Sequence, residues 1–299
     1  MKAAAISRTG PADVLTYTDL DIPDLGPDEI RVKTAYAAVN PVDVWTRMGV
    51  TGIDLPFPCI LGWDVAGTLE AAGADVTQFR VGEPVMGMVK QMARLTGTYA
   101  EYITAPAELF ARVPAGLNLD TAAAAPLTGL TASQLVDKAR LDSDSNVLVT
   151  GAAGAVGRIV VQLLIQHGHR VSGIARASDA DDLTALGIAA AYSSPDDASA
   201  QAFDAVLDTA GLPETIRNVR DGGQFISITD NEQPEPERGI EPGKNYVEES
   251  GTQLAVVAQQ LANGELSLPL HRIYPLSDAS AAHKAFEQGG VRGKILLAP

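Results

Sequence analysis

The stretch that decides the fold is Asn146-Val-Leu-Val-Thr-Gly151-Ala-Ala-Gly154-Ala-Val-Gly157. Its Val-Leu-Val core predicts a buried strand, and apolar residues then recur at helical spacing, at positions 159, 160, 163 and 164. A buried strand that turns over glycines directly into a helix is the setting in which a glycine triplet binds a dinucleotide. Gly151 permits the tight turn, Gly154 lets the backbone approach a pyrophosphate, and Gly157 allows close packing of the helix.

The same turn also has a purely structural interpretation, as a simple connection between strand and helix. Cofactor binding is the stronger interpretation, because the helix that begins here supplies free backbone N–H groups and a dipole that favours phosphate. We expect the pyrophosphate to be held by seven consecutive residues, Gly151, Ala152, Ala153, Gly154, Ala155, Val156 and Gly157.

The type of cofactor follows from the end of the next predicted strand, Ser172-Gly173-Ile174-Ala175-Arg176. A protein that binds NAD places an acid there for the ribose hydroxyls, whereas Arg176 can pair with the 2′-phosphate of NADP. The acids that follow, beginning with Asp179, are explained as stabilising a helix N-terminus with a capping box of Ser178 and Asp181. We therefore predict NADPH, with Gly173 and Arg176 at its site. The alternative for Arg176 is a solvated surface charge.

Strands and helices alternate from residue 146 onward, which indicates a parallel sheet with helices on both faces. We predict strands at 146–150, 170–175, 205–208 and 224–229, and helices at 155–167, 179–186 and 213–220. Residues 229–250 are acidic and rich in Pro and Gly, which predicts a surface loop. A helix over 252–263 follows and ends at Gly264.

The first third of the chain consists of short strand-like runs separated by Gly and Pro, which predicts a compact β-barrel. We expect a short helix with Asn40 as N-cap, Pro41 at its first position, an end near Met48 and Gly49 beyond it. The tail, with strands over 267–275 and 294–297 around a helix at 277–288, is expected to return to this domain. We therefore assign residues 1–120 and 266–299 to one domain and 121–265 to the other.

The bulk composition excludes several classes of function. The 299 residues suggest about two domains, and a formal net charge of −15 argues against binding to nucleic acid or to anionic membranes. No apolar run approaches the ~20 residues of a membrane span, so we expect a cytoplasmic protein. The single cysteine, Cys59, and the four histidines lack the spacing of metal ligands, so we expect no zinc.

Further motifs are spread over nearly the whole chain: Ala38-Val39-Asn40-Pro41-Val42-Asp43 with Arg47 and Gly49, Pro56-Phe-Pro-Cys-Ile-Leu-Gly-Trp-Asp-Val-Ala-Gly67, Gly97-Thr-Tyr-Ala-Glu-Tyr102, Pro126-Leu-Thr-Gly-Leu-Thr-Ala132 and Arg292-Gly-Lys-Ile-Leu-Leu297. Together with the glycine turn they resemble the medium-chain dehydrogenase/reductases, in the zinc-free quinone oxidoreductase (zeta-crystallin-like) branch. The resemblance implies an α/β protein with a GroES-like β-barrel catalytic domain and a Rossmann domain, a doubly wound parallel sheet. It also implies an active site in the cleft between the two domains.

The resemblance also implies roles for individual residues. It places Asn40 beside the nicotinamide ribose and the substrate, Thr128 near the nicotinamide, and Tyr192 with Arg176 near the adenosine 2′-phosphate. Packing is the alternative for Thr128 and Tyr192. Zinc-dependent relatives carry a Cys soon after the second strand and a Gly-His-Glu near position 62, where this chain has Asn40 and Gly62-Trp63-Asp64.

The predicted reaction is hydride transfer from NADPH to a quinone or to the β-carbon of a conjugated enone, with Asn40 and Trp45 as the catalytic-site residues. Many quinone reductases carry tyrosines where this chain has Trp45 and, roughly, Thr51, and Trp45 has the alternative of a core residue. A second candidate function is an enoyl or 2-alkenal reductase that acts on the C=C bond of enones. A third, of another class, is a cofactor-binding protein without turnover. We expect a small-molecule substrate and a homodimer.

Overall fold

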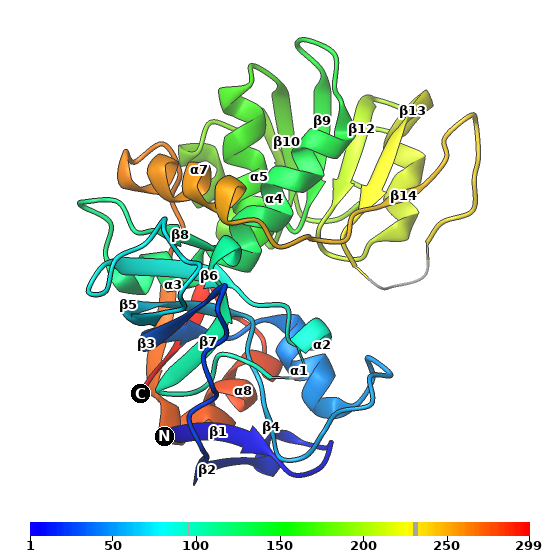
Figure 1. Ribbon diagram of the computed structural model, residues 1–299. Coiled ribbons are helices and arrows are strands. Elements are labelled where there is room, and N and C mark those ends of the chain that lie inside the picture. Colours follow the sequence, from blue (N-terminus) through cyan, green and yellow to red (C-terminus); the bar gives the residue numbers. More distant parts are fainter. Residues whose placement is uncertain (95, 230–232) are drawn as a thin grey trace. The chain divides into compact units, whose positions relative to one another are not determined.

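The chain divides into two units, Met1–Leu127 with Glu249–Pro299, and Thr128–Glu248. The structure is a computed structural model that describes all residues except 95 and 230–232 (Figure 1). The division differs from the predicted domain boundaries, because residues 121–127 and 249–265 lie in the first unit. The predicted surface loop at 229–250 falls partly outside the described residues.

Packing explains why these two segments lie in the first unit. An added Cβ at Gly251 would lie 2.4 Å from the carbonyl oxygens of Glu108 and Phe110, so the start of α7 (Gly251–Ala262) lies directly against the backbone of that unit. Helix α3 (Leu119–Ala124) buries Ala122–Ala124 against strands of the same unit. Helical periodicity in the sequence carries no information about which sheet a helix packs on.

The second unit contains a six-stranded sheet in the order β11-β10-β9-β12-β13-β14, and all of its strand pairs are parallel. The chain begins in the middle with β9, runs outward through β10 and β11, and returns to continue on the other side of β9. This is the predicted Rossmann sheet. The strands are β9 (Asn146–Thr150), β10 (Arg170–Ile174), β11 (Ala190–Tyr192), β12 (Phe203–Asp208), β13 (Val219–Ser227) and β14 (Gly243–Lys244).

Two helices predicted in this unit are shorter or tighter than expected. Residues Pro213–Asn218 form a 3-10 helix because β13 begins at the next residue, Val219, which pairs with Phe203 of β12. The segment predicted as one helix at 179–186 starts with the 3-10 turn Ala177–Asp179 and continues as α6 (Ala180–Ala185). The other helices are α4 (Pro126–Ala139) and α5 (Ala155–Gln166).

The first unit contains two sheets, a seven-stranded one in which β15-β16-β3-β5-β6-β8 are neighbours and β7 pairs with β3, and a three-stranded one in the order β2-β1-β4. The tail returns to this unit as predicted, since β16 pairs with β3. The strands are β1 (Lys2–Ile6), β2 (Leu15–Asp19), β3 (Glu29–Ala38), β4 (Cys59–Ile60), β5 (Asp64–Ala72), β6 (Pro84–Met88), β7 (Tyr102–Pro106), β8 (Phe110–Arg112), β15 (Leu270–Pro275) and β16 (Lys294–Ala298).

The helices of the first unit include α1 (Pro41–Met48), which has the predicted bounds, N-cap Asn40 and Gly49 in the left-handed conformation with φ 79°. Short helix α2 (Gln91–Arg94) and tail helix α8 (Ala279–Glu287) complete the set. The longest described helix, α4, has 14 residues, and none of those that the structure describes is long and apolar enough to cross a membrane.

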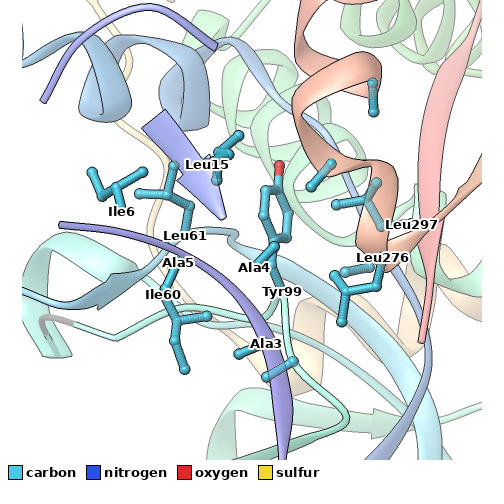
Figure 2. Close-up of a cluster of buried hydrophobic side chains, with 14 of the residues drawn as sticks. Ala3, Ala4, Ala5, Ile6, Leu15, Ile60, Leu61, Tyr99, Leu276 and Leu297 are labelled. Atoms are coloured by element: carbon cyan, nitrogen blue, oxygen red, sulfur yellow. The ribbon is translucent and has the colours of Figure 1, made fainter. Parts of the chain in front are cut away.

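One apolar core of the first unit contains residues from both ends of the polypeptide chain. Residues from β1, β4 and the tail pack together, and Figure 2 shows the Tyr99 ring among these aliphatic side chains. Tyr99 is fully buried, and its ring carries a hydroxyl oxygen at the end away from the backbone. Since a buried hydroxyl needs hydrogen-bond partners, this core requires a polar group beside it.

Candidate functional site

The glycine turn lies at the carboxyl end of β9, where the order of the strands reverses between β10 and β12. Doubly wound sheets bind their ligands at this place. Gly151 has a φ of 59°, and the N–H of Gly154 donates to the Gly151 carbonyl oxygen at 2.8 Å. Gly154 is the N-cap of α5 and is exposed, as expected for backbone that a ligand reaches.

The glycines of this region differ in what surrounds them. An added Cβ at Gly157 would lie 2.3 Å from the Gly151 oxygen, and one at Gly173 would lie 2.6 Å from the Cβ of Ala152. The packing of the protein therefore requires both. At Gly154 an added Cβ meets only the Gly151 oxygen, at 3.1 Å. The protein itself gives little reason for glycine at position 154, and a dinucleotide pyrophosphate against the turn would give one.

A carboxylate that the sequence analysis missed shapes the loop beside this turn. Asp208, the last residue of β12, is buried and accepts hydrogen bonds from the backbone N–H groups of Gly211 and Leu212 at 2.9 and 3.0 Å. It also accepts from the hydroxyls of Thr150 and Ser227, each at the end of a neighbouring strand. The available signal was an acid that ends an apolar strand and precedes Thr-Ala-Gly.

Arg176 comes shortly after β10, and Tyr192 ends β11, the edge strand that pairs with β10. Ile174 pairs with Tyr192, and the Ala175 N–H donates to the Tyr192 carbonyl oxygen at 3.0 Å. Tyr192 is half-buried and packs against an apolar cluster of this unit, so packing is at least part of its role. The structure therefore places the two residues at the ends of neighbouring strands.

Asp179 stands at a helix N-terminus, as expected for these acids, and also forms an ion pair that the sequence did not predict. It stands at the N-cap position of α6 without a side-chain capping bond, and its carboxylate accepts from the Nε–H of Arg176 at 2.9 Å. The predicted capping box differs in one respect, because Ser178 lies within the 3-10 turn and the N-cap residue of α6 is Asp179. The Arg176 side chain is 54% exposed, and the ion pair uses one of its five N–H donors.

Two residues assigned by resemblance have opposite surroundings. Thr128, in α4, is 1% exposed, as expected for the packing alternative. Trp45, in α1, is 38% exposed and five positions after Asn40, so it is not a core residue. Its partly exposed ring has apolar surface available to a ligand.

Asn40 lies at the junction of two buried hydrogen-bond networks in the first unit. It is 1% exposed, and its Nδ2 donates to the Asp64 carboxylate at 2.9 Å. Its Oδ1 accepts from the Lys294 ammonium, which is also 3.4 Å from Asp64. The second oxygen of Asp64 accepts from the Leu127 N–H at 2.7 Å. The side chain of Asn40 is thus held on both sides by buried charged groups.

The second hydrogen-bond network holds the backbone of Asn40, whose N–H donates to the Asp43 carboxylate at 2.8 Å. The Tyr99 hydroxyl donates to the same oxygen at 3.0 Å and lies 3.2 Å from the Nε2 of His283. The Nδ1 of His283 faces Arg47 at 3.5 Å, and Arg47 pairs with Glu287. Because Arg47 only donates, we assign the imidazole proton to Nε2, which donates to Tyr99.

Burial is the main cause of the pKa shifts in this second hydrogen-bond network. It raises the pKa of Asp43 to about 7, although the bonds from Asn40 and Tyr99 act in the opposite direction. It lowers the pKa of His283 to about 3, and the nearby Arg47 lowers this pKa further. His283 is therefore neutral at physiological pH, whereas Asp43 titrates there.

The described residues contain no group of three or more His, Cys, Asp or Glu side chains that could hold a metal ion. The buried thiol of Cys59 accepts from the Gln91 amide at 3.3 Å, and its pKa is raised by burial. His283 is held between Tyr99 and Arg47. Both of these side chains are therefore bonded to neighbours within the protein.

Two family models match the sequence. Residues 26–115 match the alcohol dehydrogenase GroES-like domain, and residues 183–297 match the zinc-binding dehydrogenase model. The first match lies in the unit that contains Asn40 and its two hydrogen-bond networks. The second spans strands β11 to β14 and most of the tail.

Several proteins are similar to this chain over its whole length. A 2-methylene-furan-3-one reductase of Solanum lycopersicum is 30% identical, covering 100% of this chain and 79% of the relative. An NADPH-dependent alkenal/one oxidoreductase of Arabidopsis thaliana is 27% identical, with 100% and 80% covered. The solved quinone oxidoreductase of Coxiella burnetii is 26% identical, with a TM-score of 0.90 and with 100% of this chain and 99% of that chain covered.

Proposed function

Because the chain belongs to the medium-chain dehydrogenase/reductases, in their quinone oxidoreductase branch, we propose that it reduces quinones or other electron-poor conjugated carbonyl compounds with NADPH. The family makes it an oxidoreductase. The single observation that carries the cofactor site is Gly154, an exposed glycine at the switch point of the sheet that the packing of the protein does not require.

The proposed preference for NADPH rests on the edge of the sheet formed by β10 and β11. Arg176 follows β10 where an acid would bind the ribose of NAD, and Tyr192 ends β11 beside it. A guanidinium can pair with a 2′-phosphate through donors that Asp179 does not use. The Arabidopsis relative whose name specifies NADPH adds to this support.

When bound, NADPH supplies the hydride, and the residues of the chain position it and the acceptor. We propose that Asn40 binds the nicotinamide ribose through its Oδ1, because its Nδ2 already donates to Asp64 at 2.9 Å and to the Ala38 carbonyl oxygen at 3.4 Å. We propose that Trp45 contacts the acceptor with its exposed ring. Thr128 lies near the nicotinamide in this proposal.

The negative charge that develops on the acceptor's carbonyl oxygen is stabilised by hydrogen-bond donors in this proposal, without zinc. The final proton comes from water, because an enolate or a hydroquinone anion is readily protonated. We further propose that the protein acts as a cytoplasmic homodimer on small molecules and binds neither membranes nor nucleic acid. The net charge of −15 supports the exclusion of nucleic acid.

Loss of NADPH absorbance with a panel of quinones and enones tests the proposal, and NADH serves as the matched comparison. We expect oxidation of NADPH by quinones, slower oxidation of NADH, and no effect of chelators. Turnover with enones alone would establish the alternative of a 2-alkenal reductase, which the names of two relatives favour. Tight NADPH binding without turnover of any acceptor would contradict enzyme function and indicate a cofactor-binding protein.

A further inference from the structure

Lys294 is an unusual residue for its position, because it is 4% exposed and begins a strand of otherwise apolar residues, β16. A buried ammonium is costly unless acceptors surround it. Its described acceptors are the Oδ1 of Asn40 and the carboxylate of Asp64, which is fully buried. The cation is therefore placed against one particular amide.

Asp64 completes a closed arrangement around that amide. One carboxylate oxygen accepts from the Asn40 Nδ2 at 2.9 Å and from Lys294 at 3.4 Å, and the other accepts from the backbone N–H of Leu127 at 2.7 Å. The Thr98 hydroxyl donates to the carbonyl oxygen of Asp64 at 2.8 Å, which fixes the backbone on which the carboxylate stands. Each of these groups is buried or half-buried.

The two charges determine which way the amide of Asn40 points. In the observed orientation the amide N–H faces the carboxylate and the amide oxygen faces the ammonium. A flip of the amide by a half turn would place N–H groups against the ammonium and the oxygen against the carboxylate. Both contacts would then be repulsive in a buried environment, where such contacts are costly.

We propose that Lys294 and Asp64 are positioning residues that hold the amide of Asn40 in a single orientation, with one lone pair of its Oδ1 directed to the nicotinamide ribose. This inference rests on the proposed function for its last step only. The fixed orientation itself follows from the contacts of Asn40, Asp64 and Lys294. A hydrogen-bonding group that is already oriented needs no reorganisation when its ligand binds.

The variants separate positioning from a general structural role. Breaking a buried ion pair destabilises a protein, whereas replacing both partners with apolar residues is often tolerated. The informative variant is therefore the double variant Asp64→Leu, Lys294→Met, with Lys294→Arg as the conservative replacement. Lys284→Met is the matched control, because Lys284 forms an exposed ion pair with Asp13.

The first readout is the side-chain amide signal of Asn40 in ¹H–¹⁵N NMR spectra, assigned by its loss in Asn40→Ala. It needs neither cofactor nor turnover. We expect slow hydrogen exchange of this amide in the parent protein, in Lys294→Arg and in Lys284→Met, and exchange faster by about tenfold or more in the double variant. An unchanged exchange rate in a folded double variant would overturn the proposal.

The second readout is steady-state kinetics with NADPH and 1,4-benzoquinone, together with thermal melting. We expect the double variant to lose about tenfold to a hundredfold in kcat with a smaller change in the KM for the quinone, and Lys294→Arg to restore part of kcat. A double variant that melts like the parent and keeps its kcat would contradict positioning. If the parent protein reduces no acceptor, the proposed function fails, whereas the exchange of the Asn40 amide still tests its orientation.

Discussion

The glycine turn of the second unit and the Asn40 junction of the first unit are built in opposite ways. The turn is made of backbone and is exposed at Gly154, and most of its residues carry no functional side chain. The junction is made of charged and polar side chains, and Asn40, Asp43, Asp64 and Lys294 are almost completely buried. The turn leaves backbone exposed at Gly154, whereas the junction joins buried side chains to one another inside the protein.

This difference predicts different consequences of substitution. A backbone site loses its ligand when an atom is added to it, because its function depends on empty space. A side-chain junction loses its geometry when a charge is removed, because each group is held by its partners. Binding should therefore be separable from stability at the turn, and the two should be linked at the junction.

The largest expected effect comes from Gly154→Val. The Cβ of the valine would meet only the Gly151 oxygen inside the protein, at 3.1 Å, and we expect its methyl groups to occupy the space proposed for the pyrophosphate. Gly154 has an ordinary φ of −70°, so valine is compatible with the backbone. We expect NADPH affinity to fall at least about a thousandfold, roughly 4 kcal/mol, in a fluorescence titration, with a melting temperature close to that of the parent.

Gly157→Ala is the matched control for this prediction. Its Cβ would lie 2.3 Å from the Gly151 oxygen, so this smaller substitution should destabilise the apo-protein by about 1–3 kcal/mol. If Gly154→Val binds NADPH normally, the turn is structural and the cofactor site lies elsewhere. Equal losses of stability in the two variants would contradict the distinction between them.

The junction predicts a pH effect that is hidden in the parent protein. Burial raises the pKa of Asp43 from 3.8 to about 7 and lowers that of His283 from 6.5 to about 3. Between about pH 4 and pH 6.5, folding therefore takes up a proton at Asp43 and releases one at His283. The two contributions to the pH dependence of stability have opposite signs and largely cancel.

Single variants should reveal each contribution in urea unfolding curves. In Asp43→Asn only His283 remains, and its contribution is present above about pH 6.5 and is lost as the pH falls toward 3. In His283→Gln only Asp43 remains, and its contribution is present below about pH 4 and is lost as the pH rises through 7. Each slope should approach about 1.4 kcal/mol per pH unit between about pH 5 and pH 6. Slopes of the same sign in both variants would refute the cancellation.

The elements predicted most accurately are those with local chemical signals. The bounds of α1 follow from Pro41 at its start and Gly49 at its end, and β9 follows from an apolar run that glycine ends. The segment 213–218 was predicted as an α-helix and is a 3-10 helix, because the next strand begins immediately after it. Such a constraint comes from the pairing of β13 with β12 and is absent from local sequence.

The same contrast applies to the candidate site. The glycine turn could be predicted because the residues that form it are consecutive in the sequence. The junction could not, because Lys294 lies 254 positions from Asn40 in the sequence, and only folding brings them together. Asp64 and Lys294 were recognised as parts of motifs, but their pairing was not predicted. A lysine directly before an apolar strand, Ile295-Leu296-Leu297, was the available signal.

A smaller effect is expected from Arg176→Ala, which tests the cofactor preference of the second unit. The variant loses a charge-assisted contact with the 2′-phosphate, and because the side chain is 54% exposed we expect a loss of about 1.5 kcal/mol, roughly tenfold in NADPH affinity. NADH affinity should stay nearly unchanged. Equal affinities of the parent protein for NADPH and NADH would overturn the assignment of Arg176.

The smallest effect is expected from Trp45→Ala, and it tests whether the first unit also has an open surface for a ligand. The ring is 38% exposed in α1, so its removal should change the free energy of unfolding by no more than about 1 kcal/mol and raise the KM for quinones severalfold. Trp63→Ala is the matched control, because Trp63 is 3% exposed and its loss should cost about 3–5 kcal/mol of stability. Steady-state kinetics and urea unfolding of both variants measure the two quantities separately. A Trp45→Ala protein with lowered stability and an unchanged KM would show that Trp45 packs within the unit and does not contact the acceptor.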